Sequence, residues 1–296
     1  MSSRRSRMSL RAWREAGQPW TFRGHPVFTR VTGREDAQAL LLIHGFPTAS
    51  WDWEALLPAL GQTYRVLAAD MMGFGFSDKA ADYPYSIAAQ ADLQEALLSH
   101  HGIRRYIALA HDYGDTVAQE LLARQCEQGS RAAMRGLVLL NGGLFPETHR
   151  PLLVQRFLLS PLGPLVARFT TRTALARGFR NIFGPSTQPD DELIDGAWEL
   201  MTHNRGLAVL PELIRYMTER KVHRERWVGA LQRATIPLKL ISGAADPISG
   251  RHMSERYREL IPNPDITLLE GIGHYPQCEA PEEVLRVFSD WAESMS

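Results

Sequence analysis

The stretch Ile107–Thr116, with the sequence IALAHDYGDT, decides the fold. Its apolar first half predicts a short buried strand, and its second half predicts the start of a helix, with Asp112 at the turn between them. Ala110 lies two positions before Asp112 and Gly114 two positions after it, which is the spacing of a nucleophile elbow. Small residues are needed there because the backbone turns so sharply that a larger side chain would collide with the neighbouring strand or helix. The alternative is a strand that ends in an ordinary helix-capping aspartate.

Further strands are expected on both sides of this stretch. The runs 39–43 (ALLLI), 64–69 and 136–140 (GLVLL) are continuously apolar, which is typical of strands buried on both faces of a parallel sheet. Helical patterns alternate with them, including one over 51–60. Residues 20–32 alternate apolar and polar side chains around a Gly-His-Pro turn and predict a β-hairpin. The chain therefore belongs to the α/β class, with a mostly parallel doubly wound sheet.

The alternation stops after the strand at 136–140. Residues 145–227 contain helical stretches punctuated by proline and glycine, without a clear buried strand, and the sheet resumes at 237–242 (PLKLIS). This pattern predicts a helical lid inserted into the sheet domain. We expect a first core segment over residues 1–144, a cap over 145–229 and a second core segment over 230–296.

Composition narrows the function classes. The 296 residues are 44% hydrophobic, and 33 basic side chains balance 33 acidic ones, so no overall field attracts nucleic acid or anionic membrane. The two cysteines have no framework spacing, which fits a reducing cytoplasm. No secretory signal, transmembrane run, P-loop, HExxH or GxGxxG motif is present, so no metal or organic cofactor is implied. We expect a cytoplasmic enzyme, monomeric or homodimeric, that is not inserted into membrane and has a small apolar substrate.

Three reactive side chains follow predicted strands: Asp112, Asp246 in GAADP, and His274 in GIGHYP. Parallel sheets place their sites at these carboxyl ends, and nucleophile, acid, histidine is the chain order of one known triad type. Each residue also has an ordinary explanation, because Asp246 before Pro247 can start a turn and His274 can be a packing residue. The three together, in this order, favour the catalytic interpretation.

The chemistry explains these residue types. The Asp112 carboxylate would attack an electrophilic carbon and form an alkyl-enzyme ester. His274 would act as general base on the water that hydrolyses the ester, and Asp246 would orient the imidazole. Hydrolysis passes through an oxyanion on Asp112, and the predicted donors are the backbone N–H groups of Phe46 and Tyr113.

The motifs HGFP (44–47), DMMGFGFSD (70–78), AHDYGD (110–115), GAADP (243–247) and GIGHYP (271–276) resemble the α/β-hydrolase superfamily. Within it they resemble the Asp-nucleophile branch of epoxide hydrolases and haloalkane dehalogenases. The resemblance covers nearly the whole chain and implies an α/β-hydrolase fold with a helical cap. It also implies hydrolysis through an alkyl-enzyme ester.

The resemblance leaves the electrophile open. Epoxide hydrolases of this branch use lid tyrosines as proton donors, and Tyr216 lies at the second of these positions, whereas residues 145–215 contain no tyrosine for the first. A half-buried Tyr216 with a solvated hydroxyl is the alternative. His149 and His203 also lie in the lid, but we expect both at the surface. Epoxide hydrolysis to a diol is the predicted reaction.

Haloalkane dehalogenation with the same triad is the second candidate. That family has tryptophan directly after the nucleophile, whereas this chain has Tyr113. The lid tryptophans Trp198 and Trp227 are possible replacements, although their spacing also fits helix packing. Trp198 and Phe157 are the predicted substrate-binding residues. The apolar content of the lid, which includes Phe157, indicates either a hydrophobic tunnel or simply the core of the lid. A ligand-binding scaffold without catalysis is a third candidate, and a serine esterase is disfavoured because Asp112 offers no hydroxyl.

Three charged features have simpler interpretations. Asp115 departs from the glycine of the family motif, and we expect it to cap the helix N-terminus rather than raise the pKa of Asp112. The basic clusters RGFR (177–180) and RKVHRER (220–226) are predicted solvated faces. As a hypothesis, the apolar and basic lid rests on a membrane.

Overall fold

The computed structural model describes residues 7–127 and 130–295. Its centre is an eight-stranded sheet in the order β1-β2-β4-β3-β5-β6-β7-β8. β1 and β2 form the predicted antiparallel hairpin, β2 also pairs antiparallel with β4, and the remaining pairs are parallel. The predicted α/β class with a mostly parallel sheet is confirmed. The strand bounds are β1 Gln18–Phe22, β2 His25–Thr32, β3 Ala39–Ile43, β4 Arg65–Ala69, β5 Arg105–His111, β6 Ala133–Leu140, β7 Leu238–Gly243 and β8 Ile266–Leu269.

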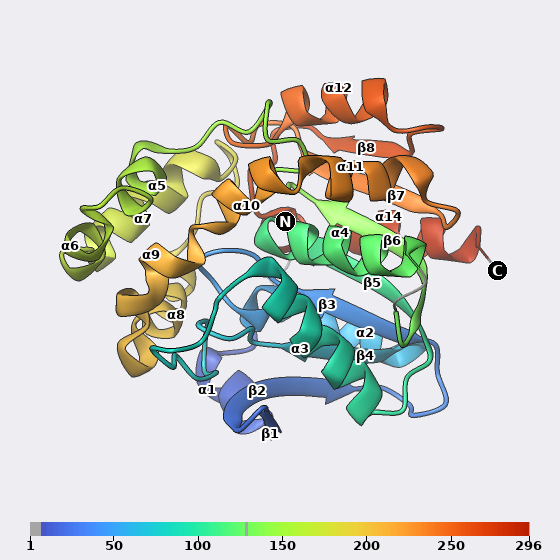
Figure 1. The fold of residues 1–296 in the computed structure, drawn as a ribbon, viewed down its shortest axis with the longest axis horizontal. Helices are drawn as coiled ribbons and strands as arrows, with labels where there is room; N and C mark the ends of the chain where they lie inside the picture. Colours follow the sequence, from blue (N-terminus) through green and yellow to red (C-terminus); the bar gives the residue numbers. More distant parts are fainter. Residues whose placement is uncertain (1–6, 128–129, 296) are drawn as a thin grey trace.

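Helices cover both faces of the sheet (Figure 1). Alternate residues of the central strands point into two separate hydrophobic clusters. This arrangement is why the strands have apolar runs rather than alternating patterns. The first cluster packs against α3 Ile87–His100, α4 Tyr113–Cys126, α11 Arg224–Arg233 and α12 Arg251–Leu260, and the second packs against α1 Leu10–Glu15, α2 Leu57–Thr63 and α14 Pro281–Glu293.

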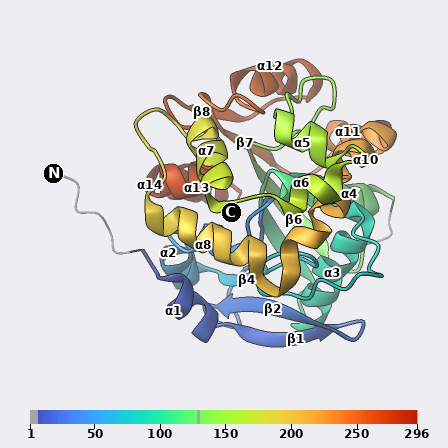
Figure 2. The same cartoon turned by 90° about the vertical axis from the view of Figure 1, so that its left-hand side faces the viewer.

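The inserted helices lie between β6 and α11 and form the lid, which stands at one side of the sheet in Figure 1 and faces the viewer in Figure 2. The predicted boundary at residues 229–230 falls inside α11, and α11 packs along the core helix α4. The lid elements are α5 Leu153–Leu158, α6 Gly163–Arg168, α7 Arg172–Ile182, α8 Asp191–Thr202, a 3-10 segment His203–Val209, α9 Leu210–Leu213 and α10 Tyr216–Val222, and the short α13 Pro276–Glu279 follows later in the core.

One predicted helix is interrupted. The sequence pattern indicated a helix over residues 51–60, but the structure has a 3-10 turn at Ser50–Trp53 and then α2 at Leu57–Thr63. Pro58 lies in the first turn of α2, where its missing N–H costs no helical hydrogen bond, whereas it would break a continuous helix. Among the described residues, no helix is long and apolar enough to span a membrane.

Candidate active site

Asp112 lies at a strained turn between β5 and α4. Its backbone has φ 49° and ψ −102°, a combination that a non-glycine residue adopts at a cost on the order of 1–3 kcal/mol. A Cβ at Gly114 would collide with the backbone carbonyls of Ile43 and His44, which explains the glycine at this position. The Asp112 side chain makes no capping hydrogen bond to α4. The geometry is that of a nucleophile elbow, and the interpretation of Asp112 as an ordinary capping aspartate is wrong.

The Asp112 carboxylate is buried and already touches a backbone donor. The N–H of Phe46, in the loop after β3, donates to Asp112 Oδ2 at 3.1 Å. The carboxylate oxygen therefore occupies the position that the predicted oxyanion would take. The Tyr113 amide makes no hydrogen bond to this carboxylate in the described part of the chain, so its role as second donor stays a prediction.

Asp246 and His274 form a buried pair at the ends of β7 and β8. Asp246 Oδ2 accepts a hydrogen bond from His274 Nδ1 at 2.8 Å. Although burial alone would lower it, the Asp246 carboxylate raises the pKa of His274 to about 9. Burial opposes ionisation of Asp246 as well, but the charge and hydrogen bond of His274 hold the pKa of Asp246 below its usual value. The imidazole is thus held in the orientation that a general base needs, with Nε2 facing away from Asp246.

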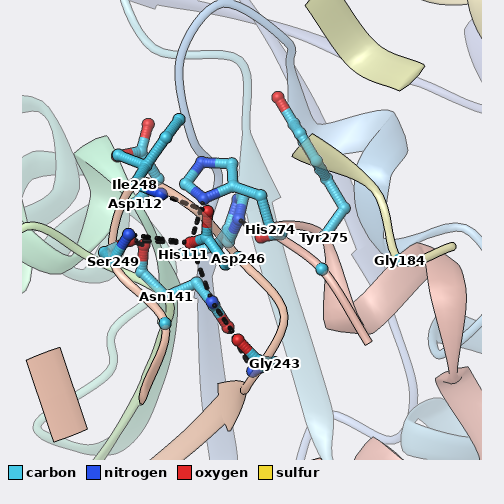
Figure 3. A network of polar contacts seen from close by, with 12 residues as sticks. His111, Asp112, Asn141, Gly184, Gly243, Asp246, Ile248, Ser249, His274 and Tyr275 are labelled. Carbon is cyan, nitrogen blue, oxygen red and sulfur yellow. Dashed lines mark hydrogen bonds and ion pairs between the residues drawn. The ribbon is translucent and has the colours of Figure 1, made fainter. Parts of the chain in front are cut away.

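The Asp246 carboxylate is the centre of a hydrogen-bond network (Figure 3). Asn141, at the end of β6, donates from Nδ2 to Asp246 Oδ2 at 2.9 Å and accepts from the Gly243 N–H at 2.7 Å. The N–H of Ile248 and both the N–H and hydroxyl of Ser249 also donate to the carboxylate. So many donors stabilise the charged form of a buried acid. The positioning function of Asn141 was not predicted, although its place at a strand end was a signal for it.

A second carboxylate fixes the loop that carries His274. Glu279 Oε2 accepts from the N–H groups of Gly273 and Gly184, and Oε1 accepts from that of Tyr275. Because Gly184 follows lid helix α7, this single side chain joins the histidine loop to the lid. His111 completes the contact on the other side, where its Nε2 lies 2.8 Å from the His274 carbonyl oxygen.

The lid places Tyr216 close to Asp112. Tyr216 is fully buried, and its ring lies 4.8 Å from that of Tyr113 and 6.1 Å from that of Phe46. Burial and the nearby Asp112 carboxylate raise the pKa of its phenol. The Tyr216 hydroxyl has no hydrogen-bond partner of good geometry among the described residues. The alternative of a half-buried tyrosine with a solvated hydroxyl is wrong, and the predicted donor lies within the site.

Arg220 is the main residue that sequence reasoning missed. It was expected on a solvated face, but it is only 3% exposed and lies one helical turn after Tyr216 on α10. Its Nε donates to Thr116 Oγ1 at 2.7 Å, and Nη2 donates to the Asp112 carbonyl oxygen at 2.9 Å. Nη1 has no partner in the described part of the chain. The spacing of four from Tyr216 was the available signal, because residues i and i+4 share one helix face.

His149 also faces this site, contrary to the expectation of a surface position. Neither ring nitrogen has a partner among the described residues, and both are buried. Burial and the charge of Arg220 lower the pKa of His149 to about 3, so the ring is neutral. The backbone of Gly143 makes room for this pair, because a Cβ there would collide with Arg220 Nη1 and approach His149 Nδ1 to 2.7 Å.

Two further acids near Asp112 have raised pKa values. Burial, and then the charge of Asp112, raise the pKa of Asp115 well above its usual value. Asp115 Oδ1 accepts a hydrogen bond from the Leu140 N–H at 3.4 Å, so the residue packs against β6 instead of capping α4. Burial also raises the pKa of Asp52 to about 8, although Thr48 donates a hydrogen bond to it. The expected capping function of Asp115 is therefore wrong.

The two predicted substrate-binding residues are not part of this cluster. Phe157 is 53% exposed, because α5 turns Gln155 and Leu158 inward and leaves Phe157 on the outer face. Its proposed position in an inner tunnel is wrong. Trp198 is half-buried against the main hydrophobic cluster, and its contact with substrate stays a prediction. Trp227 donates from Nε1 to Glu120 at 2.8 Å, so its indole N–H is already used.

Comparison with known proteins agrees with this architecture. Residues 38–281 match the family model of the alpha/beta hydrolase fold. The human mesoderm-specific transcript homolog protein is 40% identical over an alignment of 298 residues, which covers 97% of this chain and 88% of that protein. The ligand-free epoxide hydrolase CorEH superposes with a TM-score of 0.80 at 17% identity, covering 95% of this chain and 99% of its own. A loop variant of the haloalkane dehalogenase DbeA from Bradyrhizobium elkanii gives a TM-score of 0.79 at 22% identity, covering 94% and 96%.

Proposed function

The chain belongs to the α/β-hydrolase fold family, and we propose that it hydrolyses epoxides to diols with Asp112 as the nucleophile. The proposal depends on one observation. The elbow presents a carboxylate instead of a hydroxyl, and the lid places two buried donors beside it, the Tyr216 hydroxyl and Arg220 Nη1, neither of which makes a hydrogen bond of good geometry within the described residues. Such donors fit an epoxide, because its oxygen leaves the attacked carbon but remains bonded to the neighbouring carbon and needs a proton there.

In the first step, Asp112 attacks a ring carbon of the epoxide and the carbon–oxygen bond breaks. The product is an ester on Asp112 and an alkoxide on the neighbouring carbon. Tyr216 gives its phenolic proton to this alkoxide. A raised phenol pKa makes Tyr216 a weak acid, so it needs help from a fixed positive charge.

Arg220 supplies that charge. Before the reaction, its guanidinium lies 3.8 Å from Asp112 Oδ1 and is balanced by the carboxylate. When Asp112 becomes a neutral ester, the negative charge moves to the oxygen of the opened ring and then to Tyr216, whose ring lies 4.4 Å below the guanidinium. A buried cation therefore keeps a counter-charge throughout the step, without reorganisation of solvent.

In the second step, His274 takes a proton from water, and the hydroxide attacks the ester carbonyl of Asp112. The tetrahedral oxyanion forms on the oxygen that already accepts the Phe46 N–H. Collapse releases the diol and regenerates the carboxylate. The proton on His274 then returns to the tyrosinate, so the overall reaction adds one water to one epoxide.

Dehalogenation is the weaker candidate. A departing halide needs N–H donors in an apolar setting, and the residue after the nucleophile is Tyr113 rather than tryptophan. Trp227 is engaged with Glu120. Trp198 is half-buried in the main hydrophobic cluster. CorEH is an epoxide hydrolase and DbeA a haloalkane dehalogenase, and these activities belong to those proteins and do not decide between the two reactions.

The test is the intact mass of the His274→Ala protein after incubation with epoxides and, separately, with haloalkanes. Without its base the enzyme still forms the ester, which then accumulates. A mass gain equal to the whole epoxide supports the proposal. A gain equal to the haloalkane minus hydrogen halide, without an epoxide adduct, replaces it with dehalogenation.

Absence of adducts with both panels, in folded protein, supports the ligand-binding scaffold and overturns the proposal. The matched control is the double variant Asp112→Asn, His274→Ala, which lacks the nucleophile. It has to remain unmodified, because any adduct on it would come from another side chain.

A further inference from the structure

The outer face of the lid carries a concentrated apolar patch. Seven large hydrophobic side chains are exposed in the described residues, and six of them fall on α5, on α6 and on the residues directly before and after α6. Leu153 and Phe169 are the most open of these, at 71% and 70%. We call this surface the lid patch; its members are Leu153, Val154, Phe157, Leu162, Leu165 and Phe169.

The patch residues are close together in the fold. α5 and α6 pack against each other, so the exposed side chains that they carry lie in one region of the lid. Figure 1 places both helices at the outer end of the molecule, far from the sheet. Single exposed apolar residues are ordinary on soluble proteins, but a clustered set marks a surface that contacts an apolar partner.

The chain segment that carries the patch has charges of one sign only. Residues 148–189 contain six arginines and no aspartate, glutamate or lysine. Arg172 pairs with Asp191 and Asp195. The other five are exposed and have no acidic partner in the part of the chain that the structure describes: Arg150, Arg156, Arg168, Arg177 and Arg180. These unpaired guanidinium groups attract negative charge and are available to bind it.

We propose that the lid patch docks on the surface of an anionic phospholipid bilayer. The apolar side chains would enter the boundary between headgroups and acyl chains, and the arginines would extend to lipid phosphates with their apolar stems along the patch. This arrangement is peripheral and needs no membrane-spanning segment. It is independent of the proposed reaction, since none of these side chains belongs to the triad.

A second copy of the chain is the less suitable partner. In a two-fold dimer the same surface meets itself, so the unpaired arginines of one copy would face those of the other. No acidic side chain of residues 148–189 is present to compensate them. An anionic lipid surface satisfies the apolar and the charged parts of the patch together.

The experiment is co-sedimentation of the full chain with vesicles of phosphatidylcholine alone or of phosphatidylcholine mixed with phosphatidylglycerol. Wild-type protein is expected to pellet with the mixed vesicles, to bind neutral ones more weakly, and to be released by salt because exposed charges are screened. Arg156→Gln combined with Arg168→Gln is expected to weaken binding to mixed vesicles by about tenfold or more.

Phe157→Gln combined with Phe169→Gln tests the apolar part and is expected to weaken binding to both vesicle types. Val222→Gln is the matched control, because Val222 is 72% exposed on α10 and lies outside the patch. All substituted side chains are exposed, so the thermal unfolding midpoints of the variants are expected to match the wild type.

Wild-type protein that stays in the supernatant with mixed vesicles overturns the proposal. Binding that survives both double substitutions also overturns it, because the contact then lies elsewhere in the chain. Sedimentation velocity tests the remaining alternative, which is that the lid patch is a dimer interface. If the Phe157, Phe169 variant converts a dimer to a monomer while vesicle binding is unchanged, the patch is a dimer interface.

Discussion

The guanidinium of Arg220 on lid helix α10 bonds to the backbone of Asp112, the proposed nucleophile. Nη2 donates to the Asp112 carbonyl oxygen at 2.9 Å and lies 3.8 Å from carboxylate oxygen Oδ1. The lid is thereby fixed to the elbow by its charge as well as by its packing. Both groups are buried, so each compensates a charge that would be costly alone.

Substitution of Arg220 is expected to affect ring opening before ester hydrolysis. Arg220→Met should slow adduct formation in the His274→Ala background by about 10²–10³-fold, because it removes a fixed charge at the developing alkoxide. Arg220→Lys keeps the charge but cannot donate to Thr116 and Asp112 at the same time in the way the guanidinium does. The rate of adduct formation should therefore fall less than in Arg220→Met. Time-resolved intact mass measures both rates. The control is Arg215→Met, an exposed lid arginine paired with Glu212; an adduct rate in Arg220→Met equal to that of this control would contradict the role.

Tyr216→Phe should separate activity from stability. The phenol is buried without a good hydrogen-bond partner among the described residues, so loss of the hydroxyl should leave the free energy of unfolding unchanged or slightly higher. If the hydroxyl is the proton donor, adduct formation with epoxides should fall by about 10²–10⁴-fold. Urea denaturation and the adduct assay measure the two quantities. A large loss of stability would show that the hydroxyl has a structural partner instead.

Gly143→Ala should displace the lid donors without touching the triad. The added Cβ would collide with Arg220 Nη1 and crowd His149 Nδ1. We expect adduct formation to slow by about tenfold or more, because the guanidinium moves from its position over Tyr216. Gly178→Ala is the matched control in α7: no atom lies within 4 Å of its Cβ, so it should stabilise the protein by about 0.5–1 kcal/mol. Equal activity of the two variants would contradict the argument.

Local sequence patterns were sufficient to predict much of this site, whereas the positions of the other residues depend on tertiary contacts. The apolar run at 39–43 and the small residues around Asp112 specify strand and turn through local geometry, so both were predictable. Asp246 and His274 were predictable because strand ends meet at one edge of a parallel sheet. Arg220 was not, since its burial depends on Asp112, more than a hundred residues away. The prediction for Phe157 was wrong in the opposite sense, because the residue was expected inside the lid and is exposed. Hydrophobicity alone does not say which face of a short helix meets the core.

Asp52 should make the protein less stable as the pH rises. Burial raises its folded pKa from 3.8 to about 8, so between these values the folded state binds a proton that the unfolded state has released. Stability therefore falls with rising pH across this window, by an amount on the order of a few kcal/mol. Asp52→Asn cannot ionise and can still accept the Thr48 hydroxyl. Urea denaturation at about pH 5 to 8, which lies between the unfolded and folded pKa values of Asp52 roughly as linkage requires, measures the effect. The free energy of unfolding of Asp52→Asn should fall less steeply with rising pH than that of the wild type. Parallel curves for the two proteins would contradict a neutral Asp52.

His274 should become a better general base once Asp112 is esterified. Burial lowers its pKa, whereas the charges of Asp246 and Asp112 raise it to about 9 in the resting enzyme. Esterification removes the Asp112 charge, so the pKa should fall and free Nε2 for the attacking water. Asp112→Asn imitates the uncharged ester, and NMR titration should give a lower His274 pKa than in the wild type. The raised value also means that the proton stabilises the folded state below pH 6.5, and that this stabilisation is lost as the pH rises through about 9. In Asp112→Asn the loss should therefore be smaller and complete at lower pH, and an unchanged His274 pKa would refute the coupling.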